Sequence, residues 1–113
     1  MKRGEVWEVN LDPTIGAEIK KVRPCVIVSR DALARLPLKI IVPLTEWKEA
    51  FKDAPWHVLV EPTSENGLSK KSSADTYQVR SISEKRLVNR LGEVSDQVIE
   101  QIEKGLALSL ALD

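Results

Sequence analysis

The chain has 113 residues, of which 42% are apolar and 30% charged, a composition typical of one globular domain of ordinary size. No apolar run approaches the roughly 20 residues that span a bilayer, and the first residues lack a secretory apolar segment, so we expect one cytoplasmic domain over residues 1–113. One cysteine, Cys25, and one histidine, His57, are too few for an internal disulfide or for a metal site rich in either residue, so we expect no metal and no cofactor.

The formal net charge is zero, with 17 basic and 17 acidic side chains, but the charges are unevenly distributed along the chain. Residues 1–30 have six basic and four acidic side chains, residues 64–91 have six and three, and residues 92–113 have one and five. Because attraction to phosphate depends on the local potential rather than on the total charge, this distribution permits a nucleic-acid partner. It does not by itself indicate one.

Six segments, taken in chain order, have the composition of strands. Residues 5–11 alternate polar and apolar side chains, which is typical of a strand with one buried face, and residues 25–28 are a continuous apolar run, typical of a strand covered on both faces. Four later segments are also predicted as strands: 38–44, 56–60, 74–82 and 87–94, the last after a helical turn at 83–86. Several short strands joined by turn residues predict a mainly β protein, a small closed or half-closed barrel.

The segment after the last predicted strand has helical periodicity. Ser95 is a suitable N-cap, and Asp96 would lie where the helix dipole favours an anion. Apolar residues then recur at helical spacing: Val98, Ile99, Ile102, Leu106 and Leu110. Gly105 would weaken this helix by up to about 1 kcal/mol. We expect a C-terminal helix packed on the barrel, and its surplus of leucines leaves open a role in a dimer interface.

Polar groups near strand ends are the candidates for chemistry. Arg23 immediately precedes the second strand, Thr45 immediately follows the third, and Gln78 lies within the fifth. In a barrel, adjacent strand ends can bring such groups together. Cys25 lies in an apolar run and is expected to be an inert core thiol, while His57 is expected at a rim or an interface. The chain has no glycine-rich phosphate-binding loop.

Six short motifs, in this order, resemble the MazF/PemK-type toxins of bacterial toxin–antitoxin systems. They are residues 3–7 (RGEVW), 11–18 (LDPTIGAE), 22–29 (VRPCVIVS), 42–45 (VPLT), 66–68 (NGL) with Ser73, and 78–82 (QVRSI). The resemblance covers nearly the whole chain. It implies an SH3-like barrel of about five to seven strands with a C-terminal helix, acting as a homodimer.

The resemblance also implies an activity, that of a metal-independent, sequence-specific endoribonuclease that cleaves single-stranded RNA, usually messenger RNA. The family's catalytic pair is an arginine in an Arg-Pro motif and a threonine after the third strand, which by position are Arg23 and Thr45. Attack by the RNA's own 2′-OH, leaving 2′,3′-cyclic phosphate and 5′-OH ends, needs neither a metal nor a protein nucleophile. A guanidinium suits this reaction because it is planar, multidentate and always charged. Without the resemblance, a rim ion pair with Glu18 and a strand-end cap would be the simpler interpretations of the two residues.

The charged connection between the first two strands is the predicted front wall of the RNA groove. Gly16 gives it backbone freedom, Lys20 and Lys21 offer phosphate contacts, and the resemblance implies that Glu18 accepts a hydrogen bond from a base edge. The family often has glutamine and glycines where this chain has Ile19, Lys20 and Lys21, which should alter loop flexibility and base preference.

Three further residues are predicted to contact RNA: Trp47, Tyr77 and Gln78. The two aromatic rings could stack on bases, and Tyr77 stands where the family often has an acidic residue. The simpler alternatives are a solvated lysine pair at the loop tip and aromatic rings packed in the core or an interface.

A ribonuclease of this kind implies a partner that restrains it. In the family this partner is an antitoxin, a small protein whose acidic, partly disordered C-terminal tail occupies the RNA groove, and no membrane is involved. Two other interpretations stay open: a non-catalytic relative that binds DNA gyrase through the same barrel, and an SH3-like module that binds proline-rich peptides. The presence of both Arg23 and Thr45 disfavours the first, and the scatter of aromatic residues along the chain disfavours the second.

Overall fold

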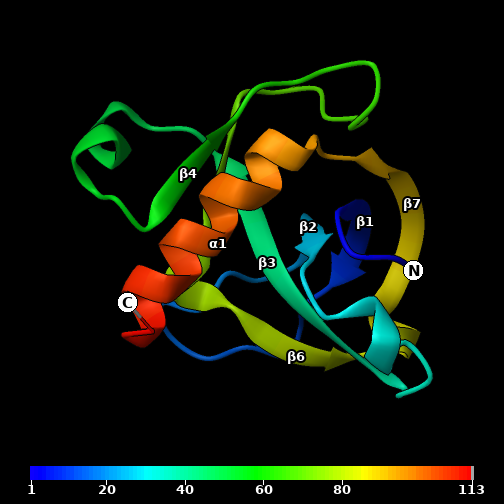
Figure 1. Ribbon diagram of the computed structural model, residues 1–113. Coiled ribbons are helices and arrows are strands. Elements are labelled where there is room, and N and C mark those ends of the chain that lie inside the picture. Colours follow the sequence, from blue (N-terminus) through cyan, green and yellow to red (C-terminus); the bar gives the residue numbers. More distant parts are fainter. Residues whose placement is uncertain (113) are drawn as a thin grey trace.

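The computed structural model describes residues 1–112, which form seven strands, four short 3₁₀ turns and one α-helix (Figure 1). The strands are β1 (Glu5–Asn10), β2 (Val22–Ile27), β3 (Leu38–Glu46), β4 (His57–Val60), β5 (Ser72–Asp75), β6 (Arg80–Ser83) and β7 (Leu87–Glu93). The 3₁₀ turns are η1 (Asp31–Leu33), η2 (Glu49–Asp53), η3 (Thr76–Gln78) and η4 (Glu84–Arg86), and the helix is α1 (Asp96–Leu110). The mainly β fold with a C-terminal helix, expected from the sequence, is confirmed.

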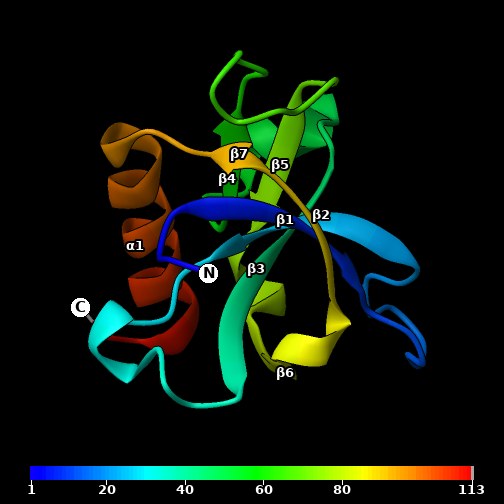
Figure 2. The same ribbon diagram turned by 90° about the vertical axis from the view of Figure 1, so that its right-hand side faces the viewer.

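All strand pairs are antiparallel, in the order β4-β5-β3-β2-β1-β7, with β6 paired to β3. The longest strand, β3, connects the two parts of the sheet, because its first residues pair with β6 and its last three pair with β5. Its middle pairs with β2, where Cys25 lies opposite Pro43. Figure 2 shows β3 running from β6 toward β5, with α1 on one side and the loop of residues 11–21 on the other.

Two apolar clusters fill the interior and lie on alternate residues of the same strands. Val26 and Val42 belong to the first cluster, whereas Cys25 and Ile41 belong to the second. Since successive residues of a strand point to opposite faces, β2 is covered on both faces, as predicted for its apolar run. Cys25 is completely buried, which confirms it as a core thiol, and burial raises the pKa of the thiol to about 12.

The C-terminal helix is capped and closely packed. Ser95 Oγ accepts from the backbone N–H of Val98 at 3.2 Å, as expected of an N-cap. Gly105 lies against η3, and a Cβ atom there would be 2.8 Å from Thr76 Cγ2, so the glycine allows the helix to approach this turn. Among the helices that the structure describes, none is long and apolar enough to cross a membrane.

The single strand predicted over residues 74–82 is wrong. The segment contains the end of β5, the turn η3 and most of β6. Asp75 Oδ1 accepts from the backbone N–H of Tyr77 at 3.1 Å, and Thr76 Oγ1 donates to the carbonyl oxygen of Trp56 at 2.6 Å. These side-chain hydrogen bonds replace the regular strand pairing and produce the turn.

The break in this strand also corrects the placement of site residues. Gln78 lies in η3 and not within a strand. Arg23 and Thr45 lie inside β2 and β3 rather than just outside them, because both strands continue beyond their buried apolar runs into less buried residues.

Candidate active site

Arg23 and Thr45, the predicted catalytic pair, come from adjacent strands. The β2–β3 register sets Cys25 opposite Pro43, and the same register continued by two residues sets Arg23 across from Thr45. Residues two apart in a strand point to the same side, so the two side chains lie on one face of the sheet. Arg23 is exposed and Thr45 is partly buried.

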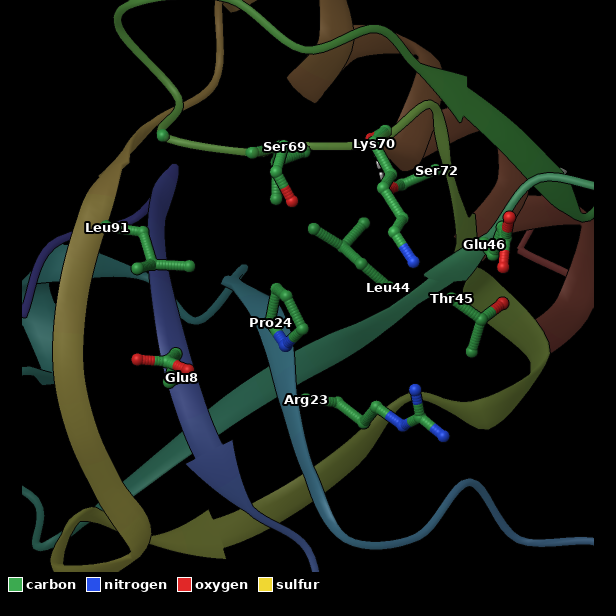
Figure 3. A pocket seen from close by; sticks show the side chains of 12 residues that line it. Glu8, Arg23, Pro24, Leu44, Thr45, Glu46, Ser69, Lys70, Ser72 and Leu91 are labelled. Atoms are coloured by element: carbon green, nitrogen blue, oxygen red, sulfur yellow. Dashed lines mark hydrogen bonds between the residues drawn. The ribbon is translucent and has the colours of Figure 1, made fainter.

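Arg23, Thr45 and Glu46 line two adjoining grooves. The first has a volume of about 350 Å³ and lies between the β-sheet and residues 67–70. The second, of about 450 Å³, extends from the same residues toward η2 and the start of β4. Figure 3 shows the first groove, with the guanidinium of Arg23 extending toward Thr45. A strand of nucleotides lying along both grooves would pass this pair.

The guanidinium of Arg23 keeps its two terminal nitrogens available. Its Nε donates to the backbone carbonyl oxygen of Lys20 at 3.2 Å, which braces the side chain. Among residues 1–112 no ion pair joins Arg23 to a carboxylate, and Glu18 Oε1 instead accepts from the backbone N–H of Ile15 at 2.6 Å. The rim ion pair considered as an alternative is therefore not formed. A braced guanidinium of this kind can bind two phosphate oxygens side by side.

His57 and Phe51 form the far wall of the second groove. Their rings stack with centroids 3.8 Å apart and an angle of 5°, and His57 Nδ1 lies 2.7 Å from Ser73 Oγ. Ser73 is also the residue opposite Thr45 in the β3–β5 register. Burial lowers the pKa of His57 from its usual value of 6.5, against the opposing charge of Asp75, so the ring is mostly neutral at pH 7. His57 thus lies at a groove rim, as expected.

The loop of residues 11–21 is closed onto the barrel by Gln78. The Gln78 Oε1 atom accepts from the backbone N–H of Ile19 at 2.7 Å, and its Nε2 donates to the carbonyl oxygen of Ala17 at 3.1 Å. Both polar ends of this side chain are occupied by the loop. Contact between Gln78 and an RNA base would therefore require the loop to move, and in this structure the residue acts as a brace.

Glu18 and Tyr77 lie close to Gln78. All three line a cavity of about 490 Å³ beneath the loop. Tyr77 has 72% of its surface exposed, which leaves its ring available for stacking. The structure thus brings these three predicted RNA-binding residues together, beside the grooves that contain Arg23 and Thr45.

Four predicted RNA-binding residues lie outside these three cavities. Gly16, Lys20 and Lys21 are exposed on the loop, and Trp47 is partly buried. The Trp47 ring meets Phe51 edge-on, with centroids 5.8 Å apart, which agrees with the packing alternative.

Three charged residues of the first groove, Glu8, Glu46 and Lys70, are not indicated by any sequence motif. Lys70 belongs to the connection between β4 and β5, and Figure 3 shows its amino group directed into the groove from the wall opposite Arg23. Its one sequence signal is its position shortly after the Asn-Gly-Leu motif. The neighbouring Lys71 shares that signal, so the sequence does not distinguish the two.

The groups at the grooves suit the chemistry of a phosphodiester. Arg23 offers a fixed cation and Thr45 a hydroxyl group, and Lys70 adds a second cation across the first groove. Within residues 1–112, no three histidine, cysteine, aspartate or glutamate side chains gather closely enough to hold a metal ion.

Comparison with known protein families identifies the chain. The profile described as "PemK-like, MazF-like toxin of type II toxin-antitoxin system" matches residues 2–110. The chain belongs to this family. Endoribonuclease MazF9 of Mycobacterium tuberculosis (strain ATCC 25618 / H37Rv) is 36% identical to it over 116 residues, which cover 99% of this chain and 98% of MazF9.

Solved MazF structures have the same fold. MazF from Deinococcus radiodurans superimposes with a TM-score of 0.82 at 21% identity, covering 98% of this chain and 96% of that one. A mycobacterial endoribonuclease in complex with its cognate antitoxin superimposes with a TM-score of 0.79 at 23% identity, covering 100% and 97%. The family resemblance inferred from the six motifs is therefore confirmed, together with the MazF-type barrel.

Proposed function

We propose that this protein is the toxin of a type II toxin–antitoxin system and acts in the cytoplasm as a metal-independent, sequence-specific endoribonuclease on single-stranded RNA, chiefly messenger RNA. Membership of the PemK/MazF family and 36% identity to the endoribonuclease MazF9 support this function. One observation supports assigning this activity to particular residues: Arg23 and Thr45 lie together where the two grooves meet.

In the proposed reaction the RNA supplies its own nucleophile. The 2′-oxygen forms a bond to the adjacent phosphorus, the P–O5′ bond breaks, and the products carry 2′,3′-cyclic phosphate and 5′-OH ends. The 2′-OH loses a proton and the 5′-oxygen gains one, so no water is consumed. The protein has to align the reacting groups and stabilise the extra negative charge on the phosphate.

Arg23 and Thr45 divide this task. Arg23 binds the phosphate oxygens through its terminal nitrogens while its Nε stays braced by Lys20. Thr45, across the β2–β3 register, directs its hydroxyl to the same phosphate. Arg23 is also our candidate for proton transfer, although a protonated guanidinium must give up a proton before it can accept one.

The proposed toxin has two protein partners. An antitoxin with an acidic C-terminal tail would compete with RNA for exposed cations such as Lys20 and Lys21, and a related mycobacterial endoribonuclease has been solved with its cognate antitoxin. The second partner is another copy of this chain. Apolar side chains at the end of α1 support a homodimer, since Leu108, Leu110 and Leu112 are 44%, 52% and 72% exposed.

The alternative is a non-catalytic relative that binds DNA gyrase. Such a protein would have no need of a cation and a hydroxyl placed at one groove. The arrangement of Arg23 and Thr45 therefore favours the nuclease.

The test is cleavage of a long single-stranded RNA in EDTA. We expect the wild type to produce cyclic phosphate ends and Arg23→Ala to lose activity by at least roughly 10²-fold, as when one transition-state donor is removed. Arg23→Lys keeps the charge but not the planar fork and should also be weak. Arg30→Ala, which removes an exposed arginine outside both grooves, is the control.

Two results would contradict the proposal. If a well-folded wild type leaves RNA intact, the nuclease function is wrong and the gyrase-binding alternative gains. If Arg23→Ala cleaves as fast as the wild type, the nuclease stands but the role of Arg23 does not. The sequenced ends of the products would also give the cleavage motif.

A further inference from the structure

The connection between β4 and β5, residues 61–71, is longer than most loops, yet its conformation is fixed by one buried side chain. Asn66 is 3% exposed. Its Oδ1 accepts from the backbone N–H groups of Thr63 and Leu68, both at 3.0 Å, and its Nδ2 donates to the carbonyl oxygen of Glu61 at 2.9 Å. A single amide thus ties both limbs of the loop together.

The same loop packs against β7, backbone to backbone. The N–H of Glu93 donates to the carbonyl oxygen of Glu65 at 2.8 Å. Gly67 has a φ of +68°, and a Cβ atom there would lie 2.2 Å from the carbonyl oxygen of Leu91. At Gly92, a Cβ atom would lie 2.1 Å from the carbonyl oxygen of Glu65. The two glycines allow a contact that no other residue permits, so the loop forms a rigid wall of the first groove.

Lys70 stands near the end of this wall and faces Arg23 across the groove (Figure 3). Among residues 1–112 no carboxylate lies within ion-pairing distance of the Lys70 amino group, whereas Lys71 pairs with Glu61 at 3.9 Å. The two adjacent lysines therefore differ: one charge is compensated within the protein and the other is directed into the groove without a counter-ion.

We propose that Lys70 binds a second phosphodiester group of the RNA, the one adjoining the scissile phosphate held by Arg23. This inference rests on the proposed ribonuclease function and adds a binding site to it. Two cations on opposite walls of a groove of about 350 Å³ attract successive phosphates of one strand. Phosphate contacts of this kind position the RNA but do not read its sequence.

The acidic residues of the same groove limit where the RNA backbone can lie, because they repel phosphate groups. Glu8 and Glu46 also line it, and Glu8 Oε1 accepts from Asn89 Nδ2 at 3.2 Å. Carboxylates repel the backbone wherever they are exposed, so the attraction is confined to Arg23 and Lys70. Because the wall that presents Lys70 is rigid, the backbone of this segment requires little ordering on binding.

The first test compares Lys70→Ala with Lys71→Ala. RNA with a 2′-deoxy sugar at the cleavage site binds without being cut, so its Kd can be measured over a range of salt concentrations. We expect the slope of log Kd against log salt to fall by about 0.7 in Lys70→Ala, the value for one lost contact to single-stranded nucleic acid. Lys71→Ala removes the same charge one residue away and should keep the wild-type slope.

The second test neutralises the RNA one phosphate at a time. A methylphosphonate in place of the phosphate next to the cleavage site should weaken binding by the wild type and by Lys71→Ala. The same substitution should not weaken binding by Lys70→Ala any further, because its partner is already absent. Thermal unfolding of the three proteins checks that the exposed substitutions leave the fold intact.

The outcomes separate this inference from the proposed function. A wild type that neither binds nor cleaves RNA would contradict both. A wild type that cleaves RNA, with equal salt slopes for Lys70→Ala and Lys71→Ala, would contradict only the Lys70 site. Sensitivity of Lys70→Ala to the same methylphosphonate as the wild type would contradict it equally.

Discussion

Thr45 occupies a position between the other polar residues of the site. It lies across from Arg23 when the β2–β3 register is continued and directly opposite Ser73 in the β3–β5 register. A β-branched side chain in a strand has restricted rotamers, so its hydroxyl is oriented before substrate arrives. Such preorganised donors act on transition-state charge without the cost of ordering them during the reaction.

Substitutions at Thr45 can separate the hydroxyl group from the shape of the side chain. Thr45→Val keeps the shape and removes the hydroxyl, and we expect single-turnover cleavage to slow by roughly 10²–10³-fold. Thr45→Ser keeps the hydroxyl and should retain most of the activity. Equal losses in both variants would show that the branched side chain, and not its hydroxyl, is required.

Glu5 is the most perturbed carboxylate of the chain that the structure describes. Burial would raise its pKa, but hydrogen bonds from Trp7 Nε1 and the backbone at Lys2, together with the amino group of Met1, outweigh burial and lower the pKa to about 2. Arg90 Nε also lies 3.5 Å from the carboxylate. Because the charged form is favoured in the folded protein, ionised Glu5 stabilises the fold.

This lowered pKa predicts how stability depends on acid. The contribution is present above the unfolded-state pKa of 4.5 and is lost as the pH falls toward 2. Glu5→Gln cannot ionise, so its unfolding free energy should be lower than that of the wild type at pH 7 and should change less between these two pH values. Denaturant titrations across this range would measure the difference, and parallel curves for the two proteins would contradict the assignment.

At the scale of the elements, strands are predictable where the side-chain pattern reflects burial. The apolar run 25–28 corresponds to β2, which is covered on both faces, and the alternation at 5–11 corresponds to β1. The single buried face expected for β1 is only partly correct, because Val9 lies in the second cluster whereas Val6 lies in the first, on the other face. The break between β5 and β6 is not predictable in this way. It depends on Thr76 donating to the carbonyl oxygen of Trp56, a contact that exists only once β4 has folded beside it.

The loop 61–71 provides a prediction at this scale. Gly67→Ala places a methyl group against the carbonyl oxygen of Leu91, whereas Gly16, which also has a positive φ, has nothing within 4 Å. Gly16→Ala should therefore lose only the roughly 1–2 kcal/mol expected for a left-handed backbone. Gly67→Ala should lose clearly more and should weaken RNA binding by displacing Lys70. Equal unfolding free energies for the two variants would show that the loop is not held against β7.

At the scale of the whole molecule, the site combines residues from segments far apart in the sequence. Arg23 and Thr45 were predictable through the family motifs, but their juxtaposition depends on strand register, which no local spacing encodes. The sequence could not distinguish Lys70 from Lys71. The Lys70 side chain points into the first groove, whereas Lys71 pairs with Glu61 at the other end of the loop, and neither feature is visible in the sequence. The bracing role of Gln78 is likewise visible only once the loop 11–21 is folded over η3.

The short turn η3 is held from both sides. On one side, Thr76 packs against Gly105 of α1, and its Oγ1 lies 3.1 Å from Ser109 Oγ. On the other side, Gln78 holds the loop of residues 11–21. A 3₁₀ helix has three residues per turn, so inserting one residue between Thr76 and Gln78 would rotate the amide by about a third of a turn away from the loop. The number of residues between Thr76 and Gln78 therefore matters as much as which residues they are. A stretch that resembles an ordinary surface turn will tolerate insertions and deletions poorly in evolution and in engineered variants alike.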